Sequence, residues 1–439
     1  MLYKFFYWIP VAFIFSTCES KRDKNYEIKY PSYQYSNNPI LEISRIIVHE
    51  ESLQLYFNAY FAPGCSIMFI EGTSIVANGK SYLPIKTQNI DIDKWKQIPE
   101  DGQIEFMMEF PALPEDVKEF DLIEDINDPN CFRIYGISLD SPVEIRNDRL
   151  SAFFDEKIII ENKKSMSQDK ISILDIEQLN TEIEINLINY DKRFKINECK
   201  LLTKWLIKKE KRFEQAGYPD DNGLVRFNFD IKEPVCVLFT ADVINCKLIL
   251  VPGQKNIFWI DVEECSRRSL RKKNKKRYTE DLVYTDNGFN YLINKLNNNQ
   301  LNIDRAVNNH FSELVYVRSS SEYFDYIEKE VKAVEFDLKK DTILNVNEYD
   351  YIKRMLSYNY IYSIVHANEL ILKNKANAYK MYGIYYGDKN KEIVTTEEII
   401  NKLNNITFSE NKYYESDVEE SLHKFIRKIS ICENTEFVK

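Results

Sequence analysis

The chain has 439 residues, and its 44% hydrophobic content is enough for packed cores in about three domains. Its formal net charge of −10 argues against a general nucleic-acid binder, because phosphate contacts need a basic surface. Glycine (11 residues) and proline (13 residues) are sparse, which argues against turn-rich repeats and against disorder.

The first residues of the chain predict export. Lys4 supplies a positive start, residues 5–15 are apolar and aromatic, and Ser16 and Thr17 are small residues directly before Cys18. This order is typical of a secretory signal. The apolar run is shorter than the roughly 20 residues that a spanning helix needs, although a plain secretory signal or a single anchoring helix stays an alternative.

Because a cysteine stands at the cut site, the segment resembles a bacterial lipoprotein signal. The resemblance implies that residues 1–17 are removed and that Cys18 becomes the lipidated N-terminus, bound to the cell envelope. Phe15 and Thr17 differ from the usual Leu and Gly or Ala at these positions. Glu19 follows the cysteine and favours the outer membrane, while the leaflet stays open.

A polar segment at residues 18–38 predicts a tether, and a β-rich domain is expected at residues 39–165. Asn78-Gly79 lies between two apolar runs and indicates a hairpin, because both residue types tolerate positive φ. Apolar residues also fall at every second position over residues 104–110. One face of that strand is therefore expected to be buried.

Residues 166–266 predict a second, sandwich-like β domain, because short apolar runs alternate with turn signals. Within it, residues 197–215 fit either a helix or an amphipathic loop. A basic linker follows at residues 267–280. It fits a patch for anionic lipid heads or polysaccharide, but a solvated linker is the preferred interpretation.

Residues 281–439 show a 3.6-residue apolar period and predict a helical domain. Three expected helices begin with capping boxes, formed by Ser319 with Glu322, Thr395 with Glu398, and Ser416 with Glu419. The expected fold class is therefore α+β, with two β-rich, sandwich-like modules followed by a helical C-terminal module.

Two β-patterned stretches carry a further resemblance. Residues 104–139 begin Ile-Glu-Phe-Met-Met-Glu-Phe-Pro, and residues 221–262 contain a Leu-x-Pro-Gly turn at residues 250–253. Together they resemble the non-catalytic N-terminal portion of envelope lipoproteins that end in a thioredoxin-like disulfide reductase domain. The resemblance implies a β-sandwich that leads into a helical region, which residues 284–296 fit.

That family's redox domain would bring a Cys-x-x-Cys motif, whose spacing lowers a thiol pKa. The chain contains no such motif, so the family's catalytic cysteines have no position here. The resemblance therefore implies a lipid-anchored binding or scaffold protein without the redox domain. Its expected partners are the membrane, through the lipid on Cys18, and an envelope protein.

The sequence predicts no catalytic, cofactor-binding or metal-ligating residue. It has no His-Glu-x-x-His, nucleophile elbow, Walker loop or dinucleotide turn, and a non-enzymatic role is favoured. A cluster of carboxylate and amide residues offers oxygen ligands for Ca²⁺ but lacks EF-hand spacing, so a turn is preferred. Its members are Asp125, Asn127, Asp128 and Asn130.

Two alternative functions stay open. The seven cysteines besides Cys18 cannot all pair within one chain, so thiol–disulfide exchange is one alternative, by a single thiol or by Cys236 with Cys246 across a predicted hairpin. Buried apolar cysteines are the simpler interpretation. The other alternative is surface capture of a nutrient or glycan by exposed aromatics, including Trp95 and Trp259.

Overall fold

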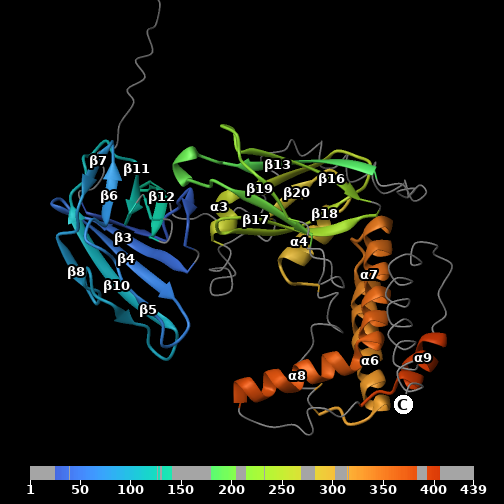
Figure 1. The fold of residues 1–439 in the computed structure, drawn as a ribbon. Coiled ribbons are helices and arrows are strands. Elements are labelled where there is room, and N and C mark those ends of the chain that lie inside the picture. Colours follow the sequence, from blue (N-terminus) through green and yellow to red (C-terminus); the bar gives the residue numbers. More distant parts are fainter. Residues whose placement is uncertain are drawn as a thin grey trace, which may run out of the picture. The chain divides into compact units, whose positions relative to one another are not determined.

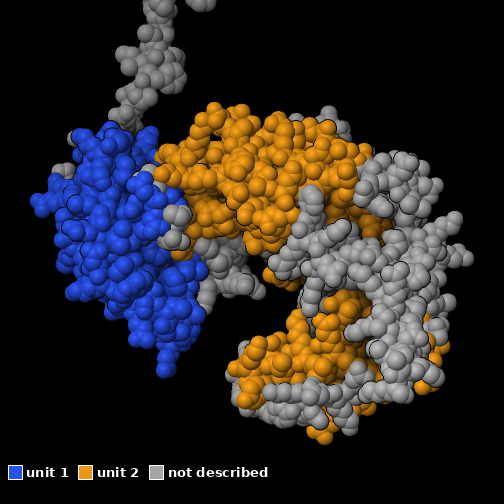
Figure 2. Space-filling view, viewed as in Figure 1, with its two compact units in different colours: residues 1–33, 40–143 blue, residues 34–39, 144–439 orange. Residues whose placement is uncertain are grey.

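The computed structural model describes residues 25–38, 40–125, 127–128, 131–140, 179–203, 214–231, 233–267, 282–301, 314, 316–382 and 393–405 (Figure 1). The chain forms two compact units (Figure 2). Unit 1 comprises residues 1–33 and 40–143, and unit 2 comprises residues 34–39 and 144–439.

The α+β class expected from the sequence is confirmed, with β-rich modules followed by helices. Several predictions concern residues outside the described ranges. These are the signal at residues 1–17, Cys18, most of the basic linker, Asn130 and the Ser416–Glu419 box.

Unit 1 is a sandwich of two sheets around one core. The first sheet has the order β1 (Tyr26–Lys29), β3 (Leu41–Val48), β4 (Ser52–Tyr60), β10 (Gln103–Pro111) and β8 (Lys86–Gln88). The second contains β12 (Arg133–Ser138), β11 (Glu119–Ile123), β6 (Ser74–Ala77) and β7 (Lys80–Tyr82) in this order. The short strands β5 (Ser66–Ile67) and β9 (Lys96–Gln97) pair separately. All these pairings are antiparallel.

Local sequence patterns explain much of unit 1. The apolar residues at alternate positions of β10 are buried, while Glu105 between them is exposed, because successive side chains of a strand point to opposite faces. Asn78 and Gly79 have φ angles of 49° and 73° and join β6 to β7, with Ala77 opposite Lys80. The strand β1 lies in the range expected to be a tether and pairs with β3.

Unit 2 begins with two four-stranded sheets. One has the order β16 (Leu224–Ile231), β13 (Leu179–Ile188), β19 (Asn256–Asp261) and β20 (Val283–Thr285), in which β13 and β19 are parallel. The other has the order β15 (Glu214–Gly217), β14 (Cys199–Thr203), β17 (Val235–Ala241) and β18 (Ile244–Leu250). The sequence suggested a helix or an amphipathic loop for residues 197–215. Both suggestions are wrong at the described ends of this range, where β14 and β15 are paired strands.

Unit 2 also includes three short elements. They are β2 (Tyr35–Ser36), the 3₁₀ turn η1 (Lys192–Phe194) and the helix α3 (Val262–Ser266). Figure 1 shows α3 directly after β19. The side chain of Asp261 caps α3 by accepting a hydrogen bond from the backbone N–H of Glu264 at 3.0 Å.

The helices of unit 2 are α4 (Asn290–Asn297), α6 (Ser320–Lys340), α7 (Val346–Val365), α8 (Ala367–Tyr382) and α9 (Thr396–Asn404). Ser319 and Thr395 are the N-caps of α6 and α9. The predicted capping box of Thr395 with Glu398 is complete, whereas the side chain of Glu322 accepts from the N–H of Arg318 instead of that of Ser319. An apolar core joins α6, α7, α8 and α9. None of the described helices is both long and apolar enough to cross a membrane.

Candidate functional site

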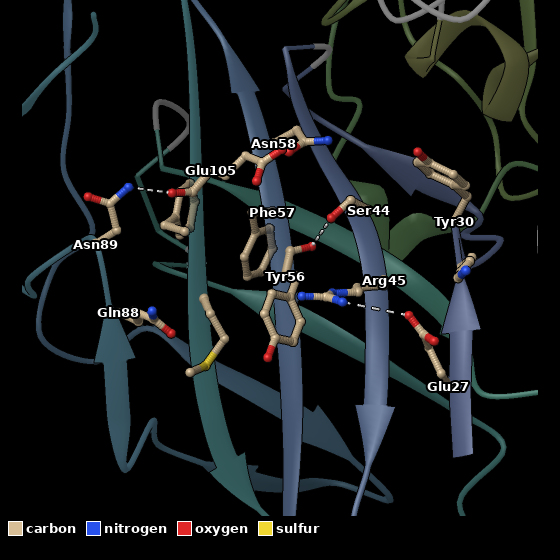
Figure 3. Close-up of a pocket in the computed structure, with 13 residues that line it drawn as sticks. Glu27, Tyr30, Ser44, Arg45, Tyr56, Phe57, Asn58, Gln88, Asn89 and Glu105 are labelled. Atoms are coloured by element: carbon tan, nitrogen blue, oxygen red, sulfur yellow. Dashed lines mark hydrogen bonds and ion pairs between the residues drawn. The ribbon is translucent and has the colours of Figure 1, made fainter.

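The described part of unit 1 has an open concavity of about 920 Å³ on the outer face of its first sheet. Side chains from β1, β3, β4, β10 and β8 meet there (Figure 3). The opposite face of the same sheet carries Leu55, Phe57 and Phe106, all buried in the sandwich core. Phe57 and Phe106 also contribute to the lining, so the floor of this solvent-open concavity lies directly on the core.

The two-residue period of β4 and β10 brings polar side chains together on this face. Tyr56 lies opposite Met107, and Asn58 lies opposite Glu105. Gln88 of β8 follows on the far side of Met107. Directly opposed residues on neighbouring strands interact, so the register sets which groups adjoin one another.

A β-bulge places Arg45 on the same face. Ile43 pairs with Phe57 and Arg45 pairs with Tyr56, which leaves Ser44 as an extra residue in β3. A bulge of this kind re-aims the side chain that follows it. The guanidinium carbon of Arg45 lies 3.8 Å from the centre of the Tyr56 ring, within the range of a cation–π interaction.

Further contacts hold these two residues. Arg45 Nη1 lies 3.8 Å from Glu27 Oε1, the Ser44 hydroxyl donates to the Tyr56 carbonyl at 3.2 Å, and the Tyr56 hydroxyl donates to Gln54 Oε1 at 3.0 Å. Figure 3 shows the Arg45–Glu27 and Ser44–Tyr56 contacts. The aromatic ring is therefore oriented before any ligand arrives.

Four polar side chains of the concavity have no hydrogen-bond or ion-pair partner in the described part of the chain. They belong to Lys29, Asn58, Gln88 and Glu105. Asn58 is only 9% exposed. Its amide lines the concavity and is therefore available to bind a ligand or an ordered water.

The charges of the concavity balance. Its lining contains two carboxylates, Glu27 and Glu105, and two cations, Lys29 and Arg45. Amide, hydroxyl and phenol groups make up most of the remaining lining. This composition is suited to a neutral, polar ligand, because a charged ligand needs a surplus of the opposite charge.

An exposed tryptophan lies close in sequence to one edge of the concavity. Asn89 of the lining donates to the Glu105 carbonyl at 2.6 Å and accepts from Lys96 Nζ at 2.9 Å. Trp95, directly before Lys96, is 70% exposed. The second aromatic candidate differs, because Trp259 of unit 2 is partly buried and packs against Tyr284 with ring centres 5.6 Å apart.

The structure does not bring the suggested cysteine pair together. Cys236 lies opposite Ile249 and Cys246 lies opposite Phe239, so the two cysteines point to opposite faces of their sheet. Burial raises the pKa of the Cys199 thiol to about 12 and that of Cys131 to about 11. Thiols with raised pKa values are poor nucleophiles.

The acidic and amide cluster at residues 125–130 forms a turn where it is described. The backbone N–H of Asn127 donates to Asp125 Oδ1 at 2.7 Å, and the N–H of Cys131 donates to the Asp128 carbonyl at 3.2 Å. Asn130 lies outside the described residues. Among the described residues, no group of three or more His, Cys, Asp or Glu side chains is placed to hold a metal ion.

Sequence reasoning missed most of the concavity. Tyr56 and Asn58 alternate with buried Leu55 and Phe57 in β4, and this alternation of polar and apolar residues is the signal that points to a solvent-facing row. The bulge that adds Arg45 has no comparable signal in the sequence. Of the two tryptophans that the sequence suggested, Trp95 is exposed and Trp259 is not.

Comparison with known proteins gives little further information. No protein-family model matches the chain, and no curated protein matches it. Pullulanase from Anoxybacillus sp. LM18-11, solved alone and with maltotriose, aligns with 45% of this chain at 7% identity and a TM-score of 0.17, and the aligned part is 24% of the pullulanase chain. The Bacillus anthracis TIE protein aligns with 54% of this chain and 40% of its own, at 9% identity and a TM-score of 0.13. Similarity at these TM-scores supports no conclusion about fold or function.

Proposed function

We propose that this protein is a non-enzymatic binding protein of the cell envelope, anchored by lipid on Cys18, and that unit 1 binds a glycan. The observation that carries the proposal is the outer face of the first sheet, where an oriented aromatic ring adjoins polar side chains. Tyr56 and Arg45 form the oriented pair, and Asn58 supplies an adjoining amide.

The chemistry of this face suits a hydroxyl-rich, uncharged ligand. A sugar ring has an apolar face that packs on an aromatic ring and hydroxyls that both donate and accept hydrogen bonds. Amides offer both functions, and a carboxylate accepts from hydroxyl donors. Asn58, Gln88 and Glu105 supply these groups beside Tyr56, and the balanced charge of the lining selects against strongly charged ligands.

The proposed location rests on the start of the sequence. A short apolar run followed by Cys18 supports export and acylation, and the outer membrane is favoured. The proposed kinship with thioredoxin-like lipoproteins adds an envelope protein as a second partner. Thiol exchange has less support, because burial raises the pKa of two of the described thiols.

The test is affinity electrophoresis of purified full-length protein in detergent, through gels that contain a neutral polysaccharide (glycogen, laminarin or galactomannan) or the anionic polygalacturonate. We expect retardation by at least one neutral polysaccharide. The variant Tyr56→Ala is expected to weaken binding by at least about tenfold, equal to about 1.4 kcal/mol.

Tyr218→Ala is the matched control, because Tyr218 is an exposed tyrosine of unit 2. It should bind like the unmodified protein. Equal retardation of both variants would place the site elsewhere. No retardation by any of the neutral polysaccharides would reject a neutral glycan as the ligand of this face, whatever the result with polygalacturonate.

A further inference from the structure

Two buried cysteines of unit 2 lie side by side. Cys246 of β18 and Cys265 of α3 have Sγ atoms 3.7 Å apart, and the two residues are 0% and 2% exposed. In the sequence they are 19 residues apart, with no local motif that links them. Their proximity arises from the fold.

The segments between the two cysteines are held firmly. The side chain of Asn256 accepts from the Val251 N–H and donates to the Val251 carbonyl, both at 2.9 Å, which closes the loop between β18 and β19. The helix α3 follows β19 without a linker and packs on β18. A buried ion pair between Arg267 Nη2 and Glu263 Oε1, at 2.6 Å, adds to its anchoring.

We infer that Cys246 and Cys265 form a disulfide when the protein folds in an oxidising compartment. The inference uses the export step of the proposed function but not the glycan site. A disulfide requires the sulfurs to approach to about 2.0 Å, a short movement from the observed separation. Disulfides persist in envelope compartments and are rare in the cytosol.

The oxidant is a disulfide, either of a thiol oxidoreductase or of a small molecule such as oxidised glutathione. One cysteine thiolate attacks this disulfide, forms a mixed disulfide and releases one thiolate of the oxidant. The second cysteine then attacks the mixed disulfide and releases the other. The protein loses two protons and two electrons, and the oxidant becomes two thiols. Because both sulfurs are buried in the folded unit, the reaction takes place before folding is complete.

The bond would connect the edge strand β18 of one sheet to the helix α3 that directly follows β19 of the other. β18 belongs to the sheet of β14 and β17, while α3 continues β19 of the second sheet. A cross-link between them restricts the unfolded chain and so stabilises the folded unit. Reduction is expected to lower the melting temperature of unit 2 by about 5 °C or more.

The experiment maps thiols in full-length protein isolated from the cell envelope. The protein is denatured, alkylated without reductant, digested and analysed by mass spectrometry. We expect the peptides that contain Cys246 and Cys265 to be joined, and the Cys236 peptide to be alkylated. Alkylation of both Cys246 and Cys265 in protein whose N-terminus is processed at Cys18 would overturn the inference.

The N-terminal peptide of the same digest separates this inference from the proposed function. An unprocessed N-terminus means that export has failed, and thiol mapping after refolding with oxidised glutathione then decides whether the pair forms. In the melting experiment, Cys265→Ser should abolish the difference between oxidised and reduced protein. Cys236→Ser, the matched control, should preserve the difference in melting temperature between oxidised and reduced protein. The pairing would be contradicted if both variants lost this difference, or if both kept it.

Discussion

Arg45 covers one side of the Tyr56 ring because β3 contains one residue more than the strand it pairs with. Ile43 and Ile46 are both buried in the sandwich core, three positions apart, and the bulge at Ser44 accommodates this spacing. Arg45 is thereby directed outward, and its guanidinium carbon lies 3.8 Å from the Tyr56 ring centre. The arginine therefore belongs to the lining of the concavity and makes little contribution to the core.

Replacing Arg45 should accordingly affect binding more than stability. The side chains of Arg45 and Glu27 are 44% and 39% exposed, and exposed ion pairs contribute about 0–1 kcal/mol. We expect Arg45→Gln to change the free energy of unfolding by less than about 1 kcal/mol and to weaken polysaccharide binding by about tenfold. Affinity electrophoresis and urea denaturation measure the two effects.

Arg226→Gln is the control for this substitution. Arg226 is an exposed arginine of unit 2 that pairs with Glu184 at 3.2 Å. It should reproduce the small loss of stability without a change in binding. A large loss of stability in Arg45→Gln alone would show that the arginine serves the fold of unit 1.

Local patterns made parts of this fold predictable. The alternation in β10, the Asn78-Gly79 hairpin and the caps Ser319 and Thr395 each depend on residues within a few positions of one another, and the structure contains all of them. Such features follow from backbone geometry and need no tertiary information.

Features that depend on tertiary packing were not predictable. The bulge at Ser44 follows from the need to bury both Ile43 and Ile46, which the sequence does not display. The sequence offers Cys236 as a possible neighbour of Cys246 across the hairpin, as an alternative to buried apolar cysteines, whereas the fold places Cys265 beside Cys246. The capping box of Asn345 with Glu348 was missed, because an Asn cap differs from the Ser or Thr of the usual pattern.

A second prediction concerns Asn256, which is fully buried in unit 2. Its side chain bonds to the N–H and carbonyl of Val251, to the Gln254 carbonyl and to Asn287. Asn256→Ala leaves several buried polar groups without partners, at about 1–3 kcal/mol each. We expect a loss of about 3 kcal/mol or more in the free energy of unfolding, measured by urea denaturation.

The control for this loss is Asn228→Ala on β16. Asn228 is exposed, so its replacement should change stability by less than about 0.5 kcal/mol. If Asn256→Ala were as harmless, the loop between β18 and β19 would not depend on this side chain. The placement of α3 would then need another explanation.

A third prediction concerns the hydrogen bond that joins α6 to α7. The hydroxyl of Tyr323, fully buried, donates to the Ser363 carbonyl at 2.7 Å. Tyr323→Phe keeps the ring and removes the donor, which should cost about 1–2 kcal/mol in thermal or urea unfolding of unit 2. Tyr218→Phe removes an exposed hydroxyl and should have no measurable effect, and equal stability of the two variants would refute the role of this bond.

The fourth prediction concerns the pH dependence of the helical part of unit 2. Glu348 accepts hydrogen bonds from the backbone N–H groups of Leu292 at 2.8 Å and Asn345 at 3.1 Å, and so joins α4 to the start of α7. Burial raises the pKa of its carboxyl to about 7 from an ordinary value of 4.5, and the charge of Asp341 adds to the increase.

The sign of the effect follows from proton binding. Between about pH 4.5 and pH 7 the folded protein binds more protons at Glu348 than the unfolded chain, so this carboxyl makes stability fall as the pH rises. The full range corresponds to about 3 kcal/mol. In Glu348→Gln the group does not titrate, so urea denaturation from pH 4.5 to 7.5 should show a smaller decline with pH than in the unmodified protein.

Glu398 provides a control with the opposite sign. It occupies the same position in the capping box of α9, but hydrogen bonds from Ser320 and from Thr395 lower its pKa. A carboxyl with a lowered pKa adds stability at neutral pH that is lost as the pH falls through its folded-state pKa. Glu398→Gln should therefore reduce the free energy of unfolding most at neutral pH and least in acid. The free energy of unfolding of Glu348→Gln, compared with that of the unmodified protein, should instead increase as the pH rises. Parallel pH profiles for the two variants would show that burial at the α4–α7 contact does not control the titration of Glu348.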